Sequence, residues 1–160
     1  IAATARKMKR KYGLGLVVVD YLQLIRPDNE KIPREQQVSA MTRELKCLAK
    51  EIEIPIVVLA QMNRLIDQRE DKRPRLSDLR ESGAIEQDAD KVIFLHRPSM
   101  DDPEDRPGEC ELTIAKNRCG RMGIVALAYH DQTTQFRDLS RFDAAEAASR
   151  AFDTSRDWTR

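Results

Sequence analysis

The chain has few of the residues from which metal sites and aromatic surfaces are built: 2 histidines, 3 cysteines and 1 tryptophan among 160 residues, with an aromatic content of 5%. Cys47, Cys110 and Cys119 are odd in number and lack metal-ligand spacing, so we expect reduced thiols and a cytoplasmic location. His96 and His130 stand far apart, and each falls where a strand is expected to end. The sequence therefore supports neither a metal-ligand cluster nor a Ser/His/Asp triad.

Long hydrophobic runs are also missing. No apolar stretch approaches the ~20 residues that span a membrane, and no secretory signal is present. The net charge of +1 gives no overall attraction to nucleic acid, so any such binding would be local. A hydrophobic content of 41% and a charged content of 34% are typical of one soluble globular domain. Because helical sequence begins at once at Ile1, without an initiator Met, we expect a fragment of a longer protein.

The most informative segment is residues 16–25 (LVVVDYLQLI), in which a valine run leads directly into Asp20. A continuous apolar run predicts a strand that is buried on both faces of a parallel sheet. A charge at its end is tolerated where the strand emerges, at the carboxyl edge, where open α/β sheets bind ligands. Asp20 can hold Mg²⁺ on a nucleotide there, in the Walker-B role, or it can cap the following loop.

A helix and a second strand follow. Apolar residues recur at alternate intervals of three and four from Val38 to Ile52, which predicts an amphipathic helix. A second apolar run over 54–60 ends at Gln61. Strand, helix and strand form a right-handed βαβ unit, so Asp20 and Gln61 are expected at the same edge of the sheet. The Gln61 amide can donate to a phosphate or a water without titrating, or it is a polar strand end satisfied by backbone.

Residues 62–82 are polar and too long for a simple connection, which is typical of a functional or mobile loop. Within 77–83 (SDLRESG), Gly83 lets a backbone N–H approach a ligand closely, and a helical sequence that can bind phosphate at its start follows. Arg80 adds a positive charge. Glu81 counts against a simple phosphate cradle, and a solvated charged loop is the alternative.

A β-hairpin is expected near the end of the chain, with Lys116 and Arg118 at its basic tip. Two residues apart on an extended segment, they share one face and can bind one anion, or they serve solubility. The other expected elements are a helix over 1–12 ended by Gly13, a loop at 26–34, strands at 92–95, 110–115 and 124–129, an exposed loop at 98–108, a hairpin connection at 116–123 and a weakly helical tail at 143–160.

No Gly-x-x-x-x-Gly-Lys-Ser/Thr sequence occurs, and Gly13-Leu14-Gly15 is no substitute. The chain therefore has nothing that cradles the β- and γ-phosphates of a nucleotide. Either Asp20 does something else, or the phosphate loop lies upstream of Ile1.

Taken together, the segments resemble the C-terminal motor domain of the bacterial replicative DNA helicase, the DnaB family of RecA-like ring ATPases, over roughly residues 15–137. Residues 16–25 resemble the Walker-B strand, and 61–64 (QMNR) the third helicase motif. The run 77–90 (SDLRESGAIEQDAD) is highly specific to this family. Residues 116–118 (KNR) resemble its K-x-R arginine-finger segment.

The resemblance implies a fold and a function. The fold is a partial RecA-like P-loop NTPase core, an α/β domain over 1–160 with a mostly parallel sheet, flanking helices, a C-terminal β-hairpin and a tail at 138–160. The function is that of a hexameric helicase that uses ATP and Mg²⁺ to translocate 5′ to 3′ on single-stranded DNA, with a primase and a helicase loader as partners.

Site residues follow from the same resemblance. It implies Asp20 for Mg²⁺ coordination and Gln61 for sensing the γ-phosphate. It places Arg80, Glu81 and Gly83 in the loop that faces DNA. Lys116 and Arg118 would reach the ATP of the neighbouring subunit. Because the Walker-A loop and the catalytic glutamate of the family are missing, we expect no ATPase activity from this chain alone.

Other readings of the sequence stay open. A RecA-like recombinase ATPase shares the Walker-B and sensor positions but should lack the 77–90 run. A response-regulator receiver also ends a valine-rich strand in Asp, but it needs an acidic pair on an earlier strand, and residues 1–14 contain no Asp or Glu. A non-catalytic interaction module that has lost its phosphate loop is the third alternative.

Overall fold

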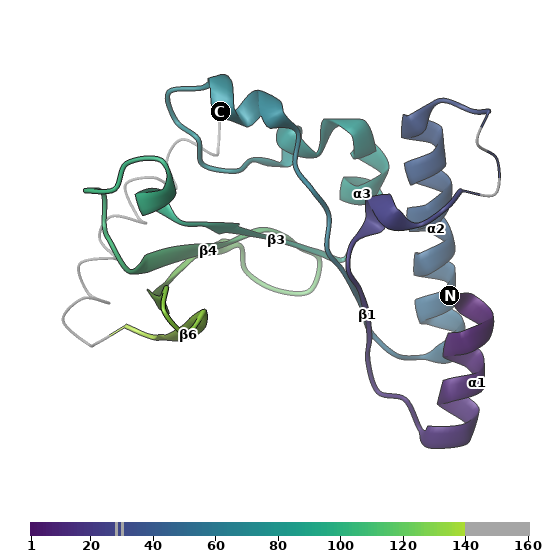
Figure 1. The fold of residues 1–160 in the computed structure, drawn as a ribbon. Helices are drawn as coiled ribbons and strands as arrows, with labels where there is room; N and C mark the ends of the chain where they lie inside the picture. Colours follow the sequence, from purple (N-terminus) through teal and green to yellow (C-terminus); the bar gives the residue numbers. More distant parts are fainter. Residues whose placement is uncertain (28, 30, 140–160) are drawn as a thin grey trace. The chain divides into compact units, whose positions relative to one another are not determined.

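The structure is a computed structural model that describes residues 1–27, 29 and 31–139, with residues 80–82 described by their backbone only. The predicted tail at 143–160 lies outside these residues, as do two positions of the loop at 26–34. The chain forms two compact units, which are described separately (Figure 1). The first unit contains residues 1–65 and 76–89, and the second contains residues 66–75 and the chain from Asp90 onward.

The first unit contains the predicted βαβ arrangement. Strands β1 (Val17–Val19) and β2 (Ile56–Val58) pair in parallel, with Val19 opposite Val58. Its other elements are the helices α1 (Ala2–Tyr12), α2 (Arg34–Ile52) and α3 (Gly83–Asp88), and the 3₁₀ helices η1 (Leu22–Leu24) and η3 (Leu76–Ser82).

Helix α2 supplies most of the core of this unit. The predicted apolar stripe is buried as expected: Val38, Met41, Leu45, Leu48 and Ile52. Because these side chains recur at the helical period, they line one face and pack against β1, β2 and α1. Helices α1 and α2 lie on the same side of the β1–β2 pair (Figure 1).

The expectation that β1 is buried on both faces is wrong. Val18 is 58% exposed and Val57 is 49% exposed, whereas their neighbours Val17 and Ile56 pack against the helices. The valine run satisfies the pattern of a doubly covered strand, but within the first unit the helices cover only one face. Apolar side chains on the other face are therefore open to solvent.

Helix α1 ends at Gly13 as predicted, and it buries little apolar surface. Gly13 ends it in the left-handed conformation, with φ at 68°, and donates its N–H to the Lys9 carbonyl at 3.0 Å. Of the apolar residues along this helix, only Ala5 is buried, while Met8 and Tyr12 are exposed. A bidentate ion pair between Arg6 and Glu51 adds a surface link to α2.

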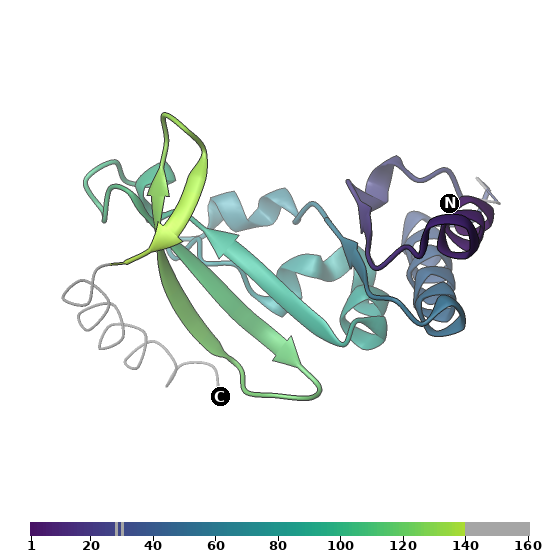
Figure 2. The same ribbon diagram turned by 90° about the horizontal axis from the view of Figure 1, so that it is seen from below.

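The second unit is a four-stranded sheet in the order β3–β4–β5–β6, and every neighbouring pair is antiparallel (Figure 2). Its strands are β3 (Lys91–His96), β4 (Glu109–Asn117), β5 (Gly123–His130) and β6 (Gln135–Asp138). The expected mostly parallel sheet is therefore wrong. Between β3 and β4 the chain returns through a loop and the 3₁₀ helix η4 (Pro98–Met100), without the crossover helix that parallel neighbours require.

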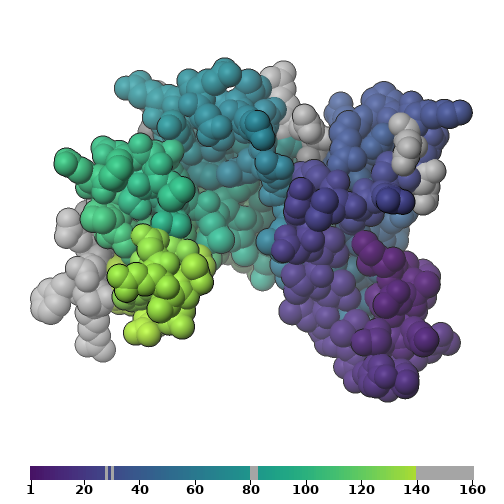
Figure 3. All heavy atoms as spheres, in the orientation of Figure 1, coloured from purple at the N-terminus to yellow at the C-terminus, as the bar shows by residue number. Residues whose placement is uncertain are grey.

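The predicted strands and hairpin of this region are confirmed. Strand β4 pairs with β5, with Thr113 opposite Ile124. The connection is shorter than the expected 116–123, because Lys116 lies within β4 and only Arg118 of the two cations follows its end. His96 and His130 end β3 and β5, as predicted. The loop between β3 and β4 and the turn after β5 meet at the surface through Arg97, which donates to Asp131 at 2.6 Å; in Figure 3 the green and yellow-green residues adjoin there.

A β-bulge interrupts β4 next to the tip. Ile114 pairs with Ile93, but Lys116 pairs with Val92, so Ala115 has no opposite residue on β3. A bulge shifts the following side chain to the other face of the strand. Lys116 therefore lies on the face that also carries Glu111 and Thr113, and not on the face of Ile114 as strict alternation predicts.

Candidate functional site

The parallel pairing of β1 and β2 brings two predicted site residues to one edge. Asp20 and Gln61 follow the carboxyl ends of these strands, and both are exposed. The ladder continues past the strands, since the Leu59 N–H donates to the Val19 carbonyl at 2.9 Å and the Leu22 N–H donates to the Leu59 carbonyl at 2.8 Å. The predicted convergence of Asp20 and Gln61 at this edge is therefore present in the structure.

Gln23 holds the main chain of Gln61 in place. The Gln23 amide nitrogen donates to the Gln61 carbonyl at 3.2 Å, and the Gln61 N–H donates to the Gln23 amide oxygen at 3.3 Å. These bonds use the backbone of Gln61 and not its side chain. Arg34 of α2 donates to the Gln23 carbonyl at 3.3 Å, which connects this brace to the helix.

The chain after Gln61 is bonded directly to the segment at 77–83. The Asn63 N–H donates to the Asp78 carbonyl at 3.1 Å, and the Asn63 side chain accepts from the Leu65 N–H at 3.1 Å. Between these segments lies a shallow hollow of about 420 Å³, lined by residues that include Asn63, Ser77, Gly83 and Glu86. Two stretches that the sequence separates therefore form one surface of the first unit.

The segment at 77–83 rests on α2. Leu79 is buried, Ile85 packs against the α2 cluster, and the Thr42 hydroxyl donates to the Asp88 carboxylate at 3.0 Å. Arg80 and Glu81 lie in η3, and Gly83 begins α3. A Cβ atom at Gly83 would meet nothing within 4 Å, so the fold itself does not require glycine there. Helix α3 has only six residues, too few to supply an anion site by its dipole.

Lys116 and Arg118 lie at the end of β4 in the second unit. The Arg118 N–H donates to the Asp90 carbonyl at 2.9 Å, and its guanidinium pairs with the Asp90 carboxylate at 3.3 Å. Both partners are at least half exposed, at 50% and 59%, which makes this a weak, exchangeable pair. The structure thus groups the predicted residues as Asp20 with Gln61 and Lys116 with Arg118, each pair within its own unit.

Asn117 shapes the tip between these two cations and the next strand. Its side-chain nitrogen donates to the Arg121 carbonyl at 3.1 Å. A Cβ atom at Gly120 would lie 2.6 Å from that nitrogen, so a side chain there would displace the Asn117 amide from this position.

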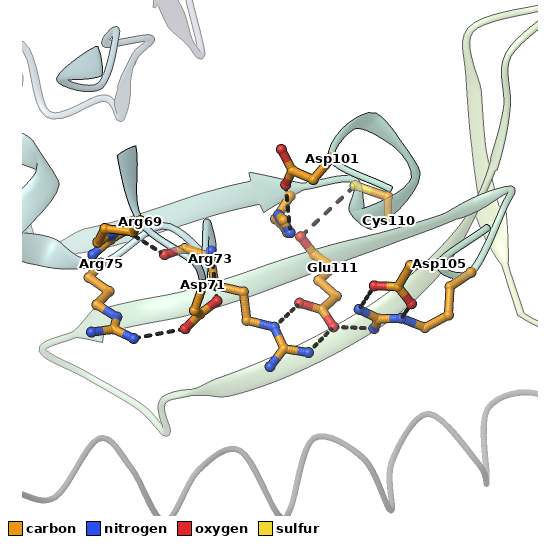
Figure 4. A network of polar contacts seen from close by, with 10 residues as sticks. Arg69, Asp71, Arg73, Arg75, Asp101, Asp105, Cys110 and Glu111 are labelled. Carbon is orange, nitrogen blue, oxygen red and sulfur yellow. Dashed lines mark hydrogen bonds and ion pairs between the residues drawn. The ribbon is translucent and has the colours of Figure 1, made fainter. Parts of the chain in front are cut away.

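The polar network around Glu111 was missed by the sequence analysis (Figure 4). Glu111 lies on the covered face of β4 with its side chain only 8% exposed. It accepts from Arg73 at 3.1 and 3.2 Å and also from Arg106. Burial alone would raise the pKa of the Glu111 carboxyl, but the hydrogen bonds and charges of the two arginines outweigh it, so the pKa is lowered. The sequence did contain a signal for this network: Glu111 is a charged residue at a position that the alternation of 110–115 can place on the buried face, where it needs a partner.

Metal-ligand clusters, disulfides and membrane-spanning helices are all absent from the part of the chain that the structure describes. There, no group of His, Cys, Asp and Glu residues could hold a metal ion by itself. The three cysteines are free thiols. None of the helices in residues 1–27, 29 and 31–139 has the length and apolar character needed to cross a bilayer.

The family model described as "DnaB-like helicase C terminal domain" matches residues 1–138. The chain belongs to this family. The match includes residues 1–14, to which the sequence analysis gave no role.

Curated relatives agree with this assignment. The chain is 49% identical over 142 residues to the "Replicative DNA helicase DnaB" of Mycobacterium leprae, a match that covers 88% of this chain and 24% of the relative. It is 47% identical over 152 residues to the protein of the same name from Geobacillus stearothermophilus, covering 91% of this chain and 33% of the relative. The chain thus spans about a quarter to a third of the relatives it matches.

Solved structures support the fold. One of them, described as an ATPase domain, has a TM-score of 0.84 at 42% identity and covers 87% of this chain and 50% of its own. A DnaB-like replicative helicase, described with its interactions with primase, has a TM-score of 0.83 at 42% identity over 87% of this chain and 35% of its own. This DnaB-like chain therefore has the α/β fold of the family's ATPase domain, although its larger sheet is antiparallel.

Proposed function

We propose that the chain is the distal part of a hexameric, ATP-driven replicative DNA helicase that translocates 5′ to 3′ on single-stranded DNA. The observation that carries this proposal is the shared edge of β1 and β2, where Asp20 and Gln61 lie, together with the bond from Asn63 to Asp78. This bond joins the chain that follows Gln61, at the proposed nucleotide edge, to the 77–83 segment of the family-specific run, and both lie in the first unit. The names of the relatives support the same function.

Asp20 and Gln61 are the proposed nucleotide residues of this chain. An exposed carboxylate at the end of a strand suits Mg²⁺, which is usually held by one or two carboxylates together with substrate phosphates and waters. The ion, when bound, would neutralise charge on the phosphates. Gln61 would orient its amide toward the γ-phosphate, while Gln23 keeps its backbone fixed.

Lys116 and Arg118 are proposed to act on the nucleotide of a neighbouring subunit. Arg118 would exchange its exposed pair with Asp90 for contacts to the γ-phosphate, at little cost because such pairs contribute about 0–1 kcal/mol. Its planar guanidinium suits the charge that spreads over the phosphoryl oxygens during transfer. Lys116 would add a second positive charge from the bulged end of β4.

Arg80, Glu81 and Gly83 are proposed to face single-stranded DNA. The bond between Asn63 and Asp78 gives a short route by which a change at Gln61 would reach this loop. Loss of the γ-phosphate would thereby alter the grip on DNA. This coupling requires two arrangements of the loop, one of which the bound nucleotide favours over the other.

The assembly and partners belong to the same proposal. ATP sites between subunits require the ring, and a primase and a loader are implied by the family. A cytoplasmic location accords with the free thiols. The family match disfavours a recombinase, whereas a non-catalytic interaction module derived from the helicase is the remaining alternative.

The decisive experiment is ATP turnover of the full-length parent protein with and without single-stranded DNA. We expect Asp20→Asn to lower turnover by about a hundredfold or more, because several kcal/mol of charge stabilisation depend on the metal ion. The matched control is Asp138→Asn, an exposed aspartate that ends β6. Near-normal turnover of Asp20→Asn, or no stimulation of the parent by DNA, would favour the interaction module.

A further inference from the structure

Residues 66–75 belong to the second unit, although the chain on both sides of them belongs to the first. Ile66 and Pro74 are buried near the two ends of this segment. Burial of apolar side chains is not directional, so the position of the segment depends on its polar contacts.

One buried ion pair attaches the segment to strand β4. The Arg73 guanidinium donates to both carboxylate oxygens of Glu111, at 3.1 and 3.2 Å, in the bidentate geometry that is the most specific for these groups. The side chain of Glu111 is 8% exposed and that of Arg73 is 28% exposed. Buried charge pairs specify arrangement more than they stabilise, because a misplaced charge would remain unpaired.

Arg73 is itself held by its own segment, as Figure 4 shows. The Arg69 guanidinium donates to the Arg73 carbonyl at 2.9 Å, and the Asp71 carboxylate accepts from the Arg73 N–H at 3.0 Å. Asp71 also accepts from Arg75 at 2.7 Å. These local bonds hold the main chain of the segment together, so that the anchor at Arg73 holds 69–75 as one piece.

The position of this attachment matters because of what lies next to it. Residue 75 is followed by η3, the start of the loop proposed to face DNA. Strand β4, which carries Glu111, ends next to Arg118 and contains Lys116. The pair between Arg73 and Glu111 thus holds the segment that leads into this loop on the strand that bears the proposed finger residues.

We propose that Glu111 is a positioning residue: by holding Arg73, it fixes the segment at 66–75 on strand β4. The DNA-facing loop continues the chain from this segment, and DNA on the loop stimulates ATP turnover only while the segment is held. This inference rests on the proposed function. The Glu111 side chain is only 8% exposed, so we expect it to act through Arg73 and not by contact with nucleotide or DNA. Its effect passes through Arg73 and then through the backbone that leads to residue 76.

The chain offers a matched control on the same carboxylate. Arg106 also donates to Glu111, but it lies in the loop before β4 and is anchored to Asp105 at 2.8 Å. Arg73→Gln and Arg106→Gln each remove one guanidinium from Glu111. Only Arg73→Gln removes a bond that holds the segment at 66–75, leaving it the weaker pair of Lys72 with Asp101 at 3.4 Å. A purely structural role of Glu111 therefore predicts similar effects of the two variants, and a positioning role predicts different ones.

The first measurement is hydrogen exchange of backbone amides in the full-length protein. We expect Arg73→Gln to raise exchange in 66–82 and to leave β4 and β5 protected, because the sheet hydrogen bonds remain. Arg106→Gln should raise exchange in the loop before β4 and not in 66–82. Equal protection of 66–82 in the wild type and Arg73→Gln would overturn the attachment.

The second measurement is ATP turnover with and without single-stranded DNA in the same proteins. We expect Arg73→Gln and Glu111→Gln to reduce the stimulation by DNA about fivefold to tenfold, within the range seen for residues that affect coupling. Turnover without DNA should remain within about twofold. The Arg73→Gln/Glu111→Gln double variant should be no worse than either single variant, because each already breaks the same link.

The outcomes distinguish this inference from the proposed function. Equal reductions of DNA stimulation in Arg73→Gln and Arg106→Gln, or additive reductions in the double variant, would overturn the positioning role. If the wild type binds no single-stranded DNA, the proposed function fails and the positioning role fails with it. The exchange experiment would then still show whether Glu111 holds the segment.

Discussion

At the scale of single residues, the buried face of the antiparallel sheet brings His96 opposite Glu111. His96 lies 3.7 Å from the Asp101 carboxylate, and its side chain is only 11% exposed. Burial lowers the pKa of His96 below its usual 6.5, although the carboxylates of Glu111 and Asp101 oppose this effect. His96 and Glu111 therefore both hold protons less tightly in the folded state than in the unfolded state.

We expect acid to destabilise the chain in two steps. The unfolded His96 binds its proton near pH 6.5 and the folded one at lower pH, so the free energy of unfolding decreases as the pH falls below 6.5. The stabilisation by Glu111 is complete above its unfolded pKa of 4.5 and is lost as the pH falls through its lower folded value. Urea unfolding from about pH 7 to about pH 2 measures both steps.

His96→Gln separates these contributions. It should flatten the pH dependence just below 6.5 and leave the later decrease in place, because Glu111 keeps both arginines. An unchanged profile in this variant would mean that His96 is not the group that titrates in the first step.

At the scale of elements, periodicity predicted which side chains of one helix or strand share a face, but not which distant segments pair. The α2 stripe and the alternation in β4 follow from the chain alone, since each period specifies which side chains share a face. The right-handed crossover then placed Asp20 and Gln61 together. The direction in which β3 pairs with β4 has no such signal, because a strand has the same period in parallel and antiparallel sheets and no short turn connects these two.

The site residues that were missed depend on contacts between distant segments. Gln23 meets Gln61, Asn63 meets Asp78, and neither pairing follows from spacing. The bulge at Ala115 was also missed, because no glycine or proline marks it. The placement of Glu111 near Arg73 depends on the path of 66–75, which only the folded chain defines.

The loop at 76–83 gives a prediction at this scale. In the full-length parent, Arg80→Ala should weaken binding of single-stranded DNA regardless of sequence, because a phosphate contact positions DNA and does not specify bases. The slope of log K against log[salt] should become shallower by about 0.7 for each phosphate that is no longer neutralised. Fluorescence anisotropy with labelled oligonucleotides at several salt concentrations measures both the binding constant and this slope.

Arg121→Ala is the control for this prediction, since Arg121 is an exposed arginine of the hairpin tip. It should leave the slope unchanged if the DNA contact belongs to the loop. Intact hexamers with an unchanged slope in Arg80→Ala would identify the loop as a solvated surface.

At the scale of the whole molecule, the two units hold different parts of the proposed ATP chemistry. Asp20 and Gln61 belong to the first unit, and Lys116 and Arg118 to the second. The family's phosphate loop is in neither. A complete site therefore needs segments beyond this chain, and the proposal assigns its arginine finger to a neighbouring subunit.

The strongest test of that assignment uses Arg118→Ala in the full-length parent. Because the guanidinium would meet charge only in the transition state, ATP turnover should fall by about 10³-fold or more while nucleotide binding is kept. Lys116→Ala should cost less, since an ammonium lacks the planar fork of arginine. Steady-state phosphate release measures turnover, and equilibrium binding of a labelled nucleotide measures affinity.

Mixed rings decide whether Arg118 acts in trans. Subunits with Arg118→Ala are combined with subunits whose phosphate loop is inactive, and the composition of the rings is verified by native mass spectrometry. At interfaces that join an intact phosphate loop to an intact Arg118, turnover should return, although neither homogeneous ring is active. No recovery in verified mixed rings would argue against action in trans. Near-normal turnover of rings made only of Arg118→Ala subunits would instead remove Arg118 from catalysis and leave it as a partner of Asp90 beside the hairpin.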